Sequence, residues 1–285
     1  MSAPRALCIH DLSGVGRCSL GVILPVLAAC GAQGCAVPTA LLSTHTGGFG
    51  TPARTAEALF AHRALEHYRA LGLSFDCVYS GYLASPDCAQ LVCEAHRLWP
   101  EALKVADPVL GDNGRPYAFV TPRLTEAMAG LCRTADIITP NVTESALLLG
   151  RSPEMRPWTQ DEALGRLAEL RQTFGGAVVL TGISLSDGTH ANGILPAEGG
   201  PVLLRYAQAA GHCPGTGDLF CAALTGTLLR GLSLSECTAL AAEFVRRAVD
   251  SSAAAGTDAR FGAEYEAHLS LLIPKKESET VSCSH

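Results

Sequence analysis

The chain has 285 residues, a length that suits a single α/β domain better than two full domains with a linker. Apolar residues make up 48% and charged residues 17%, which allows a large core and excludes disorder of the chain as a whole. The net charge of −6 excludes the basic footprint of a general nucleic-acid binder.

Short apolar runs rich in β-formers alternate with helical patterns along the chain. The predicted strands are residues 6–10, 33–38, 75–80, 103–107, 136–140, 177–182, 193–196 and 202–207. The predicted helices are residues 16–29, 52–71, 86–99, 121–129, 141–149, 160–173, 215–229, 234–251 and 261–272. This alternation predicts a mostly parallel sheet covered on both faces, with strands 193–196 and 202–207 as an edge hairpin.

Residues 37–50 interrupt the alternation, because they are rich in Thr, Ser and Gly and carry His45. We expect this segment to form a flap over a site. The pattern as a whole predicts one domain over residues 1–273, followed by a flexible tail at 274–285 that is poor in apolar residues.

The chain shows no membrane or secretion feature at this level. Its longest apolar stretch, residues 20–32, contains Pro25 and is shorter than the roughly 20 residues that a membrane span needs. The first residues lack a secretory signal pattern, so we expect a cytoplasmic protein without a membrane partner.

Twelve cysteines are present, and none forms a Cys-x-x-Cys pair. The closest spacings, Cys30 to Cys35 and Cys88 to Cys93, match no zinc or redox template. Most of the cysteines lie in apolar segments, which predicts reduced structural thiols. A metal- or redox-sensing protein is the alternative that the absence of paired cysteines argues against.

Polar residues follow four of the predicted strands: Asp11, Asp107, Asn141 and Thr181. Ligands of open parallel sheets bind at the carboxyl ends of the strands. We therefore expect these four residues to lie around one site.

The segment Gly215-Thr216-Gly217-Asp218 opens a predicted helix. Its glycines allow a tight turn with bare N–H groups, and a helix N-terminus attracts phosphate. Asp218 is then either a partner of the helix dipole or a base that takes a proton from an attacking hydroxyl.

Two further segments carry carboxylates. Asp107 and Asp112 lie on a Gly-rich loop, which is typical of a turn or of a magnesium site. Asn141 and Glu144 have the spacing of a helix N-cap with a capping box, and they would also suit a metal-bound phosphate. For the second segment the structural and functional interpretations are compatible.

The remaining polar candidates are ambiguous from the residues alone. Residues 13–19 are neither a Walker A motif nor a Gly-x-Gly-x-x-Gly fingerprint. Asp11 is placed either to bond a ring substituent or to lie solvated in a turn. His45 is a structural loop histidine or a ligand, and Tyr82 faces a flat ring or packs on the sheet.

Five segments in this order resemble the ribokinase-like superfamily and, within it, the pyridoxal kinases. They are Ser43-Thr44-His45-Thr46, Ser80-Gly81-Tyr82-Leu83, Asp107-Pro108-Val109-Leu110-Gly111-Asp112, Thr139-Pro140-Asn141-Val142-Thr143-Glu144 and Gly215-Thr216-Gly217-Asp218. The resemblance covers residues 6 to about 249 and implies a three-layer α/β/α sandwich with a small flap and an edge hairpin.

The resemblance also implies the activity, which is ATP-dependent phosphorylation of the hydroxymethyl group of a vitamin B6 vitamer. The implied catalytic group is Asp218 with Gly215, Thr216 and Gly217 as the anion hole. The implied ATP-binding residues are Asp107, Asn141, Thr181, Gly182, Gly215 and Gly217, and those for Mg²⁺ are Asp112 and Glu144. The implied substrate-binding residues are Asp11, Ser43, His45, Thr46 and Tyr82. A monovalent cation such as K⁺ is a further candidate cofactor, and a homodimer that uses residues 41–50 is the expected assembly.

One segment departs from the pyridoxal kinase pattern. Asp11-Leu12-Ser13-Gly14-Val15-Gly16 stands where a Ser-x-Val-x-x-Gly segment is expected, and it resembles the hydroxymethylpyrimidine kinases of thiamine synthesis. That activity is therefore the alternative, and the preferred vitamer stays open. A non-catalytic B6-binding protein is disfavoured because the base and the glycines are present. Cys213 could add to an aldehyde substrate, but we expect that it does not.

Overall fold

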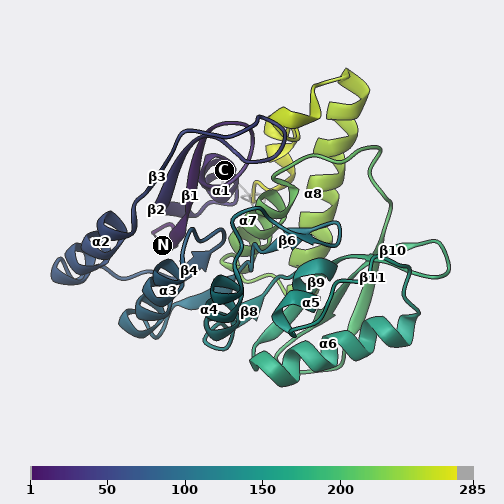
Figure 1. Cartoon of the computed structure of the whole chain (residues 1–285), viewed down its shortest axis with the longest axis horizontal. Coiled ribbons are helices and arrows are strands. Elements are labelled where there is room, and N and C mark those ends of the chain that lie inside the picture. Colours follow the sequence, from purple (N-terminus) through teal and green to yellow (C-terminus); the bar gives the residue numbers. More distant parts are fainter. Residues whose placement is uncertain (1, 275–285) are drawn as a thin grey trace, which may run out of the picture.

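The computed structural model describes residues 2–274 (Figure 1), so the predicted tail lies outside the described residues except for Pro274. One large sheet runs through these residues in the order β11-β10-β9-β8-β5-β4-β1-β2-β3. Its strands are β1 (Arg5–Val15), β2 (Gln33–Thr44), β3 (Arg54–Ala56), β4 (Cys77–Ser80), β5 (Leu103–Ala106), β8 (Ile137–Ile138), β9 (Ala177–Ser184), β10 (His190–Leu195) and β11 (Val202–Tyr206).

The six strands from β2 to β9 in this order pair in parallel, whereas β3, β10 and β11 pair antiparallel at the two edges. The predicted edge hairpin is confirmed, with Ile194 opposite Val202. A small separate ribbon joins β6 (Gly111–Asp112) to β7 (Arg115–Pro116). The mostly parallel sheet is the one that the alternation predicts.

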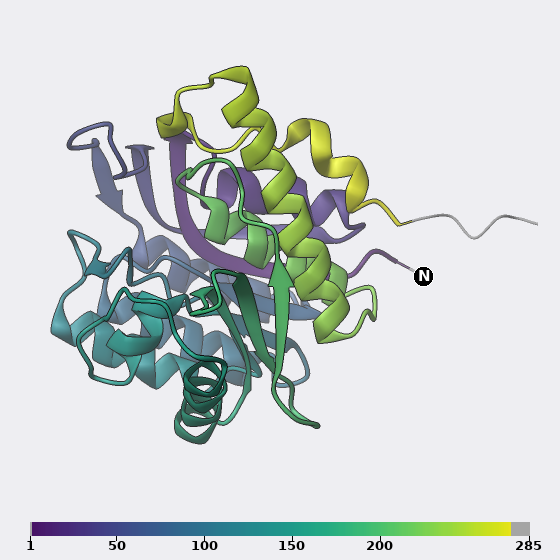
Figure 2. The ribbon, with the colours of Figure 1, turned by 90° about the vertical axis from the view of Figure 1, so that its right-hand side faces the viewer.

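Helices cover both faces of the sheet (Figures 1 and 2). One face carries α1 (Leu20–Ala29), α7 (Thr216–Leu228) and α8 (Leu234–Ala255). The other face carries α2 (Ala58–Ala70), α3 (Pro86–Leu98), α4 (Pro122–Cys132), α5 (Val142–Leu148) and α6 (Gln160–Phe174). Successive β1 residues alternate between the two cores, with Ala6 and Cys8 on one face and Leu7 and Ile9 on the other. The result is the three-layer α/β/α sandwich.

The flap segment contains more strand than we expected. β2 continues to Thr44, and its residues 40–42 pair with β3. The sequence predicts a helix over 52–71, and β3 occupies the beginning of that range. The helix α2 therefore begins only at Ala58. Pairing with a distant strand determines the conformation of residues 54–56, and hydrophobic periodicity carries no information about such pairing.

The predicted helix over 261–272 is wrong. Two short 3₁₀ helices, η1 (Ala259–Phe261) and η2 (Glu266–Leu271), stand there instead. Gly262 separates them with a φ of 79°, and a β-carbon at this glycine would lie 2.8 Å from Arg17. This left-handed glycine, held against the β1–α1 loop, ends the first turn.

The strand order places a crevice beside β1. The chain passes from β1 to β2 on one side and then returns to add β4 on the other side. Ligands of open α/β sheets bind at the carboxyl ends of strands at such a switch point. In residues 2–274, no helix combines the length and apolar character that crossing a bilayer requires.

Candidate active site

The N-terminus of α7 is built on glycines, and Gly215 is its N-cap with a left-handed φ of 80°. A β-carbon at Gly215 would lie 2.0 Å from the carbonyl oxygen of Arg17, so only glycine fits against the β1–α1 loop. The first N–H groups of a helix have no intrahelical partner. With the dipole of this 13-residue helix, they form an anion-binding end.

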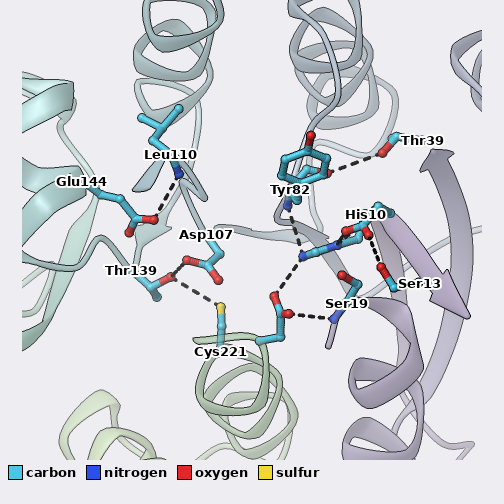
Figure 3. Close-up of polar contacts among 12 residues, drawn as sticks. His10, Ser13, Ser19, Thr39, Tyr82, Asp107, Leu110, Thr139, Glu144 and Cys221 are labelled. Carbon is cyan, nitrogen blue, oxygen red and sulfur yellow. Dashed lines mark hydrogen bonds and ion pairs between the residues drawn. The ribbon is translucent and has the colours of Figure 1, made fainter. Parts of the chain in front are cut away.

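Asp218 lies in the first turn of α7, and both of its carboxylate oxygens are held. Oδ2 accepts a hydrogen bond of 2.7 Å from the backbone N–H of Ser19, while Oδ1 lies 3.2 Å from His10 Nε2 (Figure 3). Ser19 has a φ of 55°, which is rare for a residue with a side chain. The β1–α1 loop is thus shaped to orient this carboxylate.

Asp11 follows β1's buried half and faces away from open solvent. Its Oδ1 lies 2.8 Å from His10 Nδ1, and its Oδ2 accepts a hydrogen bond of 3.1 Å from Ser13 Oγ. Burial acts to raise the pKa of Asp11, but the hydrogen bond and charge of His10 lower it below its ordinary value. Both oxygens are therefore engaged within the protein, and direct contact with a substrate ring stays a prediction.

Asp107 and Glu144 form a second buried acidic pair on the other side of Asp218. Burial and then the charge of Asp218 raise the pKa of Asp107 to about 7. Burial and then the charge of Asp107 raise the pKa of Glu144 well above its usual range. The charge of Asp218 thus acts on Asp107 and that of Asp107 acts on Glu144, and such a group of carboxylates suits a cation or an added proton.

The segment that begins α5 caps this helix and also lies at the candidate site, so it fits both the structural and the functional interpretation of Asn141 and Glu144. Asn141 Oδ1 accepts from the N–H of Glu144 at 2.9 Å, and Glu144 Oε2 accepts from the N–H of Asn141 at 2.9 Å. The predicted capping box is confirmed. Glu144 Oε1 also accepts from the N–H of Leu110 at 3.1 Å, so the loop after β5 is fastened to α5.

Thr181 and Gly182 lie beside this segment. Thr181 forms an isolated parallel bridge with Asn141, and its N–H donates to Pro140 at 2.9 Å. Gly182 has a φ of 72°, and its N–H donates to Asn192 Oδ1 at 3.3 Å. These bonds connect β9 to the segment after β8 and to β10, and they place Thr181 beside Asn141.

Asp112 lies on β6, at the rim of the candidate site. Its oxygens accept from the N–H and side-chain amide of Asn113 at 2.8 and 3.0 Å, and Oδ2 lies 3.7 Å from His212 Nε2. Over residues 2–274, no three acidic, histidine or cysteine side chains gather closely enough to hold a metal by themselves. A metal bound here would need further oxygen ligands from water and phosphate, which is the usual coordination of Mg²⁺ in proteins.

One cavity of about 600 Å³ collects most of the predicted residues. Those that line it are Asp107, Asp112, Asn141, Glu144, Thr181, Gly182, Gly215, Thr216, Gly217 and Asp218. A part that the sequence analysis did not anticipate is apolar and is formed by Phe220, Ala242, Val245 and the segment 206–209. The cavity therefore offers an anion-binding end, a carboxylate and an apolar wall in one space.

The predicted ring-binding residues of the flap lie outside this cavity wall. His45 Nε2 donates to the carbonyl oxygen of Arg260 at 2.6 Å, and Nδ1 accepts from the N–H of Gly47 at 3.0 Å. Ser43 Oγ accepts from the N–H of Ala53 at 3.0 Å, and Thr46 is exposed. These bonds hold the flap to its neighbours, so contact with a substrate stays a prediction for these residues.

Tyr82 lies two residues after the end of β4, beside His10 of β1. Its backbone carbonyl accepts from Thr39 Oγ1 at 3.5 Å, and its backbone N–H lies 3.1 Å from His10 Nε2 (Figure 3). The side chain is half-buried, and burial raises its pKa. Its proposed place against a substrate ring is likewise a prediction.

Sequence reasoning missed three residues that shape the site: His10, Ser19 and Asn192. His10 and Asp11 are adjacent ionisable residues at the end of a buried strand, which is a signal that could have been used. Asn192 is a buried amide within β10, a strand that is otherwise largely apolar there. Ser19 acts through its backbone, and no sequence pattern reveals that.

A three-layer α/β/α sandwich with a mostly parallel central sheet is the architecture of the ribokinase-like kinases. The phosphomethylpyrimidine kinase family model matches residues 24–261. The chain belongs to the phosphomethylpyrimidine kinase family.

Relatives and solved structures agree with this assignment. A pyridoxine/pyridoxal/pyridoxamine kinase of Bordetella avium is 31% identical over 82% of this chain and 80% of its own length. A Bacteroides thetaiotaomicron protein described as a phosphomethylpyrimidine kinase, crystallised with pyridoxal, is 32% identical with a TM-score of 0.88, covering 96% of this chain and 98% of its own. Pyridoxal kinase from Lactobacillus plantarum is 33% identical with a TM-score of 0.86, covering 94% and 96%.

Other relatives are much longer than this chain. Two multifunctional thiamine biosynthesis proteins, from Corynebacterium efficiens and Corynebacterium glutamicum, are 29% and 27% identical. The matched part of this chain spans 26% and 30% of their respective lengths. The relatives thus include both a kinase named for pyridine substrates and proteins named for thiamine biosynthesis.

Proposed function

We propose that this protein transfers the γ-phosphoryl group of ATP to the hydroxymethyl group of a vitamin B6 vitamer. The observation that carries the proposal is the position of Asp218, a carboxylate fixed by two partners in the first turn of α7 and open to the cavity. The Bordetella and Lactobacillus relatives bear the names of pyridoxal kinases, and the Bacteroides structure holds pyridoxal, which supports the choice of substrate.

In the proposed reaction, Asp218 accepts the proton of the attacking hydroxyl group. The hydroxyl oxygen forms a bond to the γ-phosphorus, the bond from that phosphorus to the β,γ-bridging oxygen breaks, and ADP leaves. Backbone N–H groups of residues 215–217 stabilise the charge on the transferred group. The proton ends on Asp218 and passes to solvent after release.

The cavity suits ATP. Asn141, Thr181, Gly182 and the α7 N-terminus would meet its phosphates, with Asp107 nearby, and the apolar wall around Val245 would take the base. The acidic groups Asp112 and Glu144 fit Mg²⁺, because burial and then the charge of Asp107 raise the pKa of Glu144, and a cation beside that carboxylate would favour its charged form. When bound, the ion supplies positive charge to the phosphates. A monovalent cation such as K⁺ remains a further candidate.

We place the vitamer ring near the carboxyl ends of β1 and β4, under the flap. Asp11, Ser43, His45, Thr46 and Tyr82 are the residues that the resemblance assigns to it. In this arrangement Asp218 stands between the ring site and the anion-binding end.

Hydroxymethylpyrimidine kinase is the second candidate. The segment from Asp11 to Gly16 favours it, as do the family model and the thiamine biosynthesis relatives. A coupled ADP-release assay with Mg-ATP and separate pyridoxal, pyridoxamine, pyridoxine and hydroxymethylpyrimidine separates the two. Turnover of a B6 vitamer above the pyrimidine supports the proposal, and preference for the pyrimidine overturns it.

We also propose a homodimer that acts in the cytoplasm, where Mg-ATP is available. Leu12 and Leu41 are cross-strand neighbours on the extended ends of β1 and β2, and both side chains are exposed. Adjacent exposed leucines on a strand pair favour burial against a second copy. Light scattering on the wild type and on Leu41→Glu tests this, with a dimer expected for the former and a monomer for the latter. A monomeric wild type would refute it.

A further inference from the structure

His10 is a buried histidine enclosed between two carboxylates. The residue is 1% exposed, with Nδ1 lying 2.8 Å from Asp11 Oδ1 and Nε2 lying 3.2 Å from Asp218 Oδ1 (Figure 3). Asp11 belongs to β1 and Asp218 to α7, so the imidazole joins the middle of a strand to the start of a helix.

The backbone is shaped to make this contact. Neighbouring residues of a strand point to opposite faces, so His10 and Asp11 would normally diverge. The pairing of β1 with β2 shifts register between His10 and Leu12. The extra residue of this irregularity lies on β2, where three steps face two on β1, and beside it the Asp11 carboxylate reaches the His10 ring at 2.8 Å.

A slot for the ring is present on β4's side. A β-carbon at Gly81 would lie 2.0 Å from His10 Nε2 and 2.1 Å from Cδ2. The φ of Gly81 is not in the left-handed region, so space alone requires this glycine. The Ser80-Gly81-Tyr82 segment therefore makes room for the imidazole.

The charges around His10 favour its protonated form. Only the imidazolium donates from both nitrogens, as two flanking carboxylates require. The N–H groups of Asp11 and Tyr82 also point at these nitrogens, at 2.9 and 3.1 Å, but a backbone dipole is weaker than a full charge. Burial lowers the pKa of His10, while Asp218 and then Asp11 raise it to about 10.

Further titratable groups face this cluster from the neighbouring elements. Tyr79 of β4 packs edge-on to the His10 ring, with centroids 6.4 Å apart. Asp107 follows β5, and besides burial the charge of Asp218 raises its pKa while the charge of His10 lowers it. Cys18, in the β1–α1 loop, is buried near both Asp11 and Asp218, and its pKa is raised mainly by burial.

We propose that His10 is a positioning residue, which holds the base Asp218 in its working orientation and joins it to Asp11 in one hydrogen-bonded chain. The proposal rests on the proposed function, in which Asp218 accepts the hydroxyl proton. His10 touches no reacting atom in this scheme. It fixes Oδ1 of the base as the Ser19 N–H fixes Oδ2, and its positive charge offsets the two carboxylates.

Two amide variants separate the two contacts. The amide nitrogen of Gln matches the position of Nε2, so His10→Gln keeps a donor toward Asp218. That of Asn matches Nδ1, so His10→Asn keeps a donor toward Asp11 only. We expect kcat to fall by about 10- to 100-fold in His10→Asn and clearly less in His10→Gln, since a hydrogen bond to a charged group is worth about that factor.

The pH profile and KM provide readouts that a merely structural role would not move. Both variants lose the positive charge, so the acidic limb of kcat against pH moves to higher pH in both, while the KM for ATP stays within about twofold. His96→Gln is the matched control, because His96 is also buried but lies on α3. The proposal would be overturned if the two His10 variants had the same kcat as each other and the same pH profile as the wild type.

A measurement on the wild type keeps the two proposals distinguishable. In ¹⁵N-histidine spectra, with the His10 signal assigned by its loss in His10→Gln, the ring should stay protonated above about pH 8 and titrate lower in Asp218→Asn. A His10 that titrates near its ordinary value of about 6.5 would overturn the proposal. This result is independent of which substrate is turned over, so an inactive wild type would count against the proposed function alone.

Discussion

The backbone N–H of Ser19 donates a hydrogen bond of 2.7 Å to the side chain of Asp218, which lies 199 positions later in the chain. Ser19 holds a left-handed φ of 55° to do so. A rare backbone conformation of this kind persists only where the surroundings impose it, and such conformations gather at functional sites. The loop after β1 and the start of α7 therefore form one unit around the base.

Replacing Asp218 with Asn should remove the proton acceptor and keep the shape of the site. We expect kcat to fall by about 10²- to 10⁴-fold, the usual contribution of a general base, while ATP still binds. Turnover by ADP release and ATP affinity by calorimetry would check this. Near-normal turnover in the variant would show that Asp218 is not the base.

Gly81→Ala should displace His10 without touching any proposed catalytic group. The added β-carbon would lie 2.0 Å from His10 Nε2, so the ring must move, at a cost of about 1–3 kcal/mol in the free energy of unfolding. We expect kcat to fall together with Tm. Gly130→Ala is the control, because this α4 glycine has open space around it and alanine there should stabilise the helix by up to about 1 kcal/mol. An active Gly81→Ala with an unchanged Tm would contradict the slot.

The two glycines of the α7 N-terminus should respond differently to alanine. Gly215 has a φ of 80° and no space for a β-carbon, so Gly215→Ala should lower both Tm and kcat. Gly217 is helical with nothing within 4 Å, so Gly217→Ala should keep or raise Tm. Because Gly217 lines the cavity, its methyl group should still reduce turnover. Thermal unfolding and ADP release on both variants test this, and full activity of Gly217→Ala would place the transferred phosphoryl group elsewhere.

The stability of the ligand-free protein should depend on pH through Asp107. Its pKa is raised from 3.8 to about 7, so between these values the folded state holds a proton that the unfolded state has released. This contribution is complete below about pH 4 and is lost as pH rises through about 7. Asp107→Asn cannot titrate, so its Tm should fall less than that of the wild type between about pH 5 and pH 8. Parallel curves for the two proteins would show that Asp107 has an ordinary pKa.

The sequence by itself determined the layers of this fold and the order of its main strands and helices, whereas strands such as β1 and β2 extend beyond their predicted ends. Alternating apolar runs and helical patterns reproduce the parallel sheet, and the capping box at Asn141 and Glu144 is a local hydrogen-bond pattern that four residues specify. The segment 215–218 could also be recognised from the sequence as the start of a helix, because glycines before a helical pattern are a local signal. Of the four polar residues expected around one site, Asp107, Asn141 and Thr181 line the cavity together with the segment 215–218, and Asp11 does not.

Only the tertiary structure decided which side chains meet. The contacts of His10 with Asp218 and of Ser19 with Asp218 join residues about 200 positions apart. They lie beside a register shift between β1 and β2 and at a residue with a left-handed φ, Ser19. Likewise, β3 replaced a predicted helix turn, and Gly262 broke the predicted last helix, because distant chain segments impose these conformations. Local sequence signals encode propensity, whereas the orientation of the base is a property of packing between segments that only folding brings together.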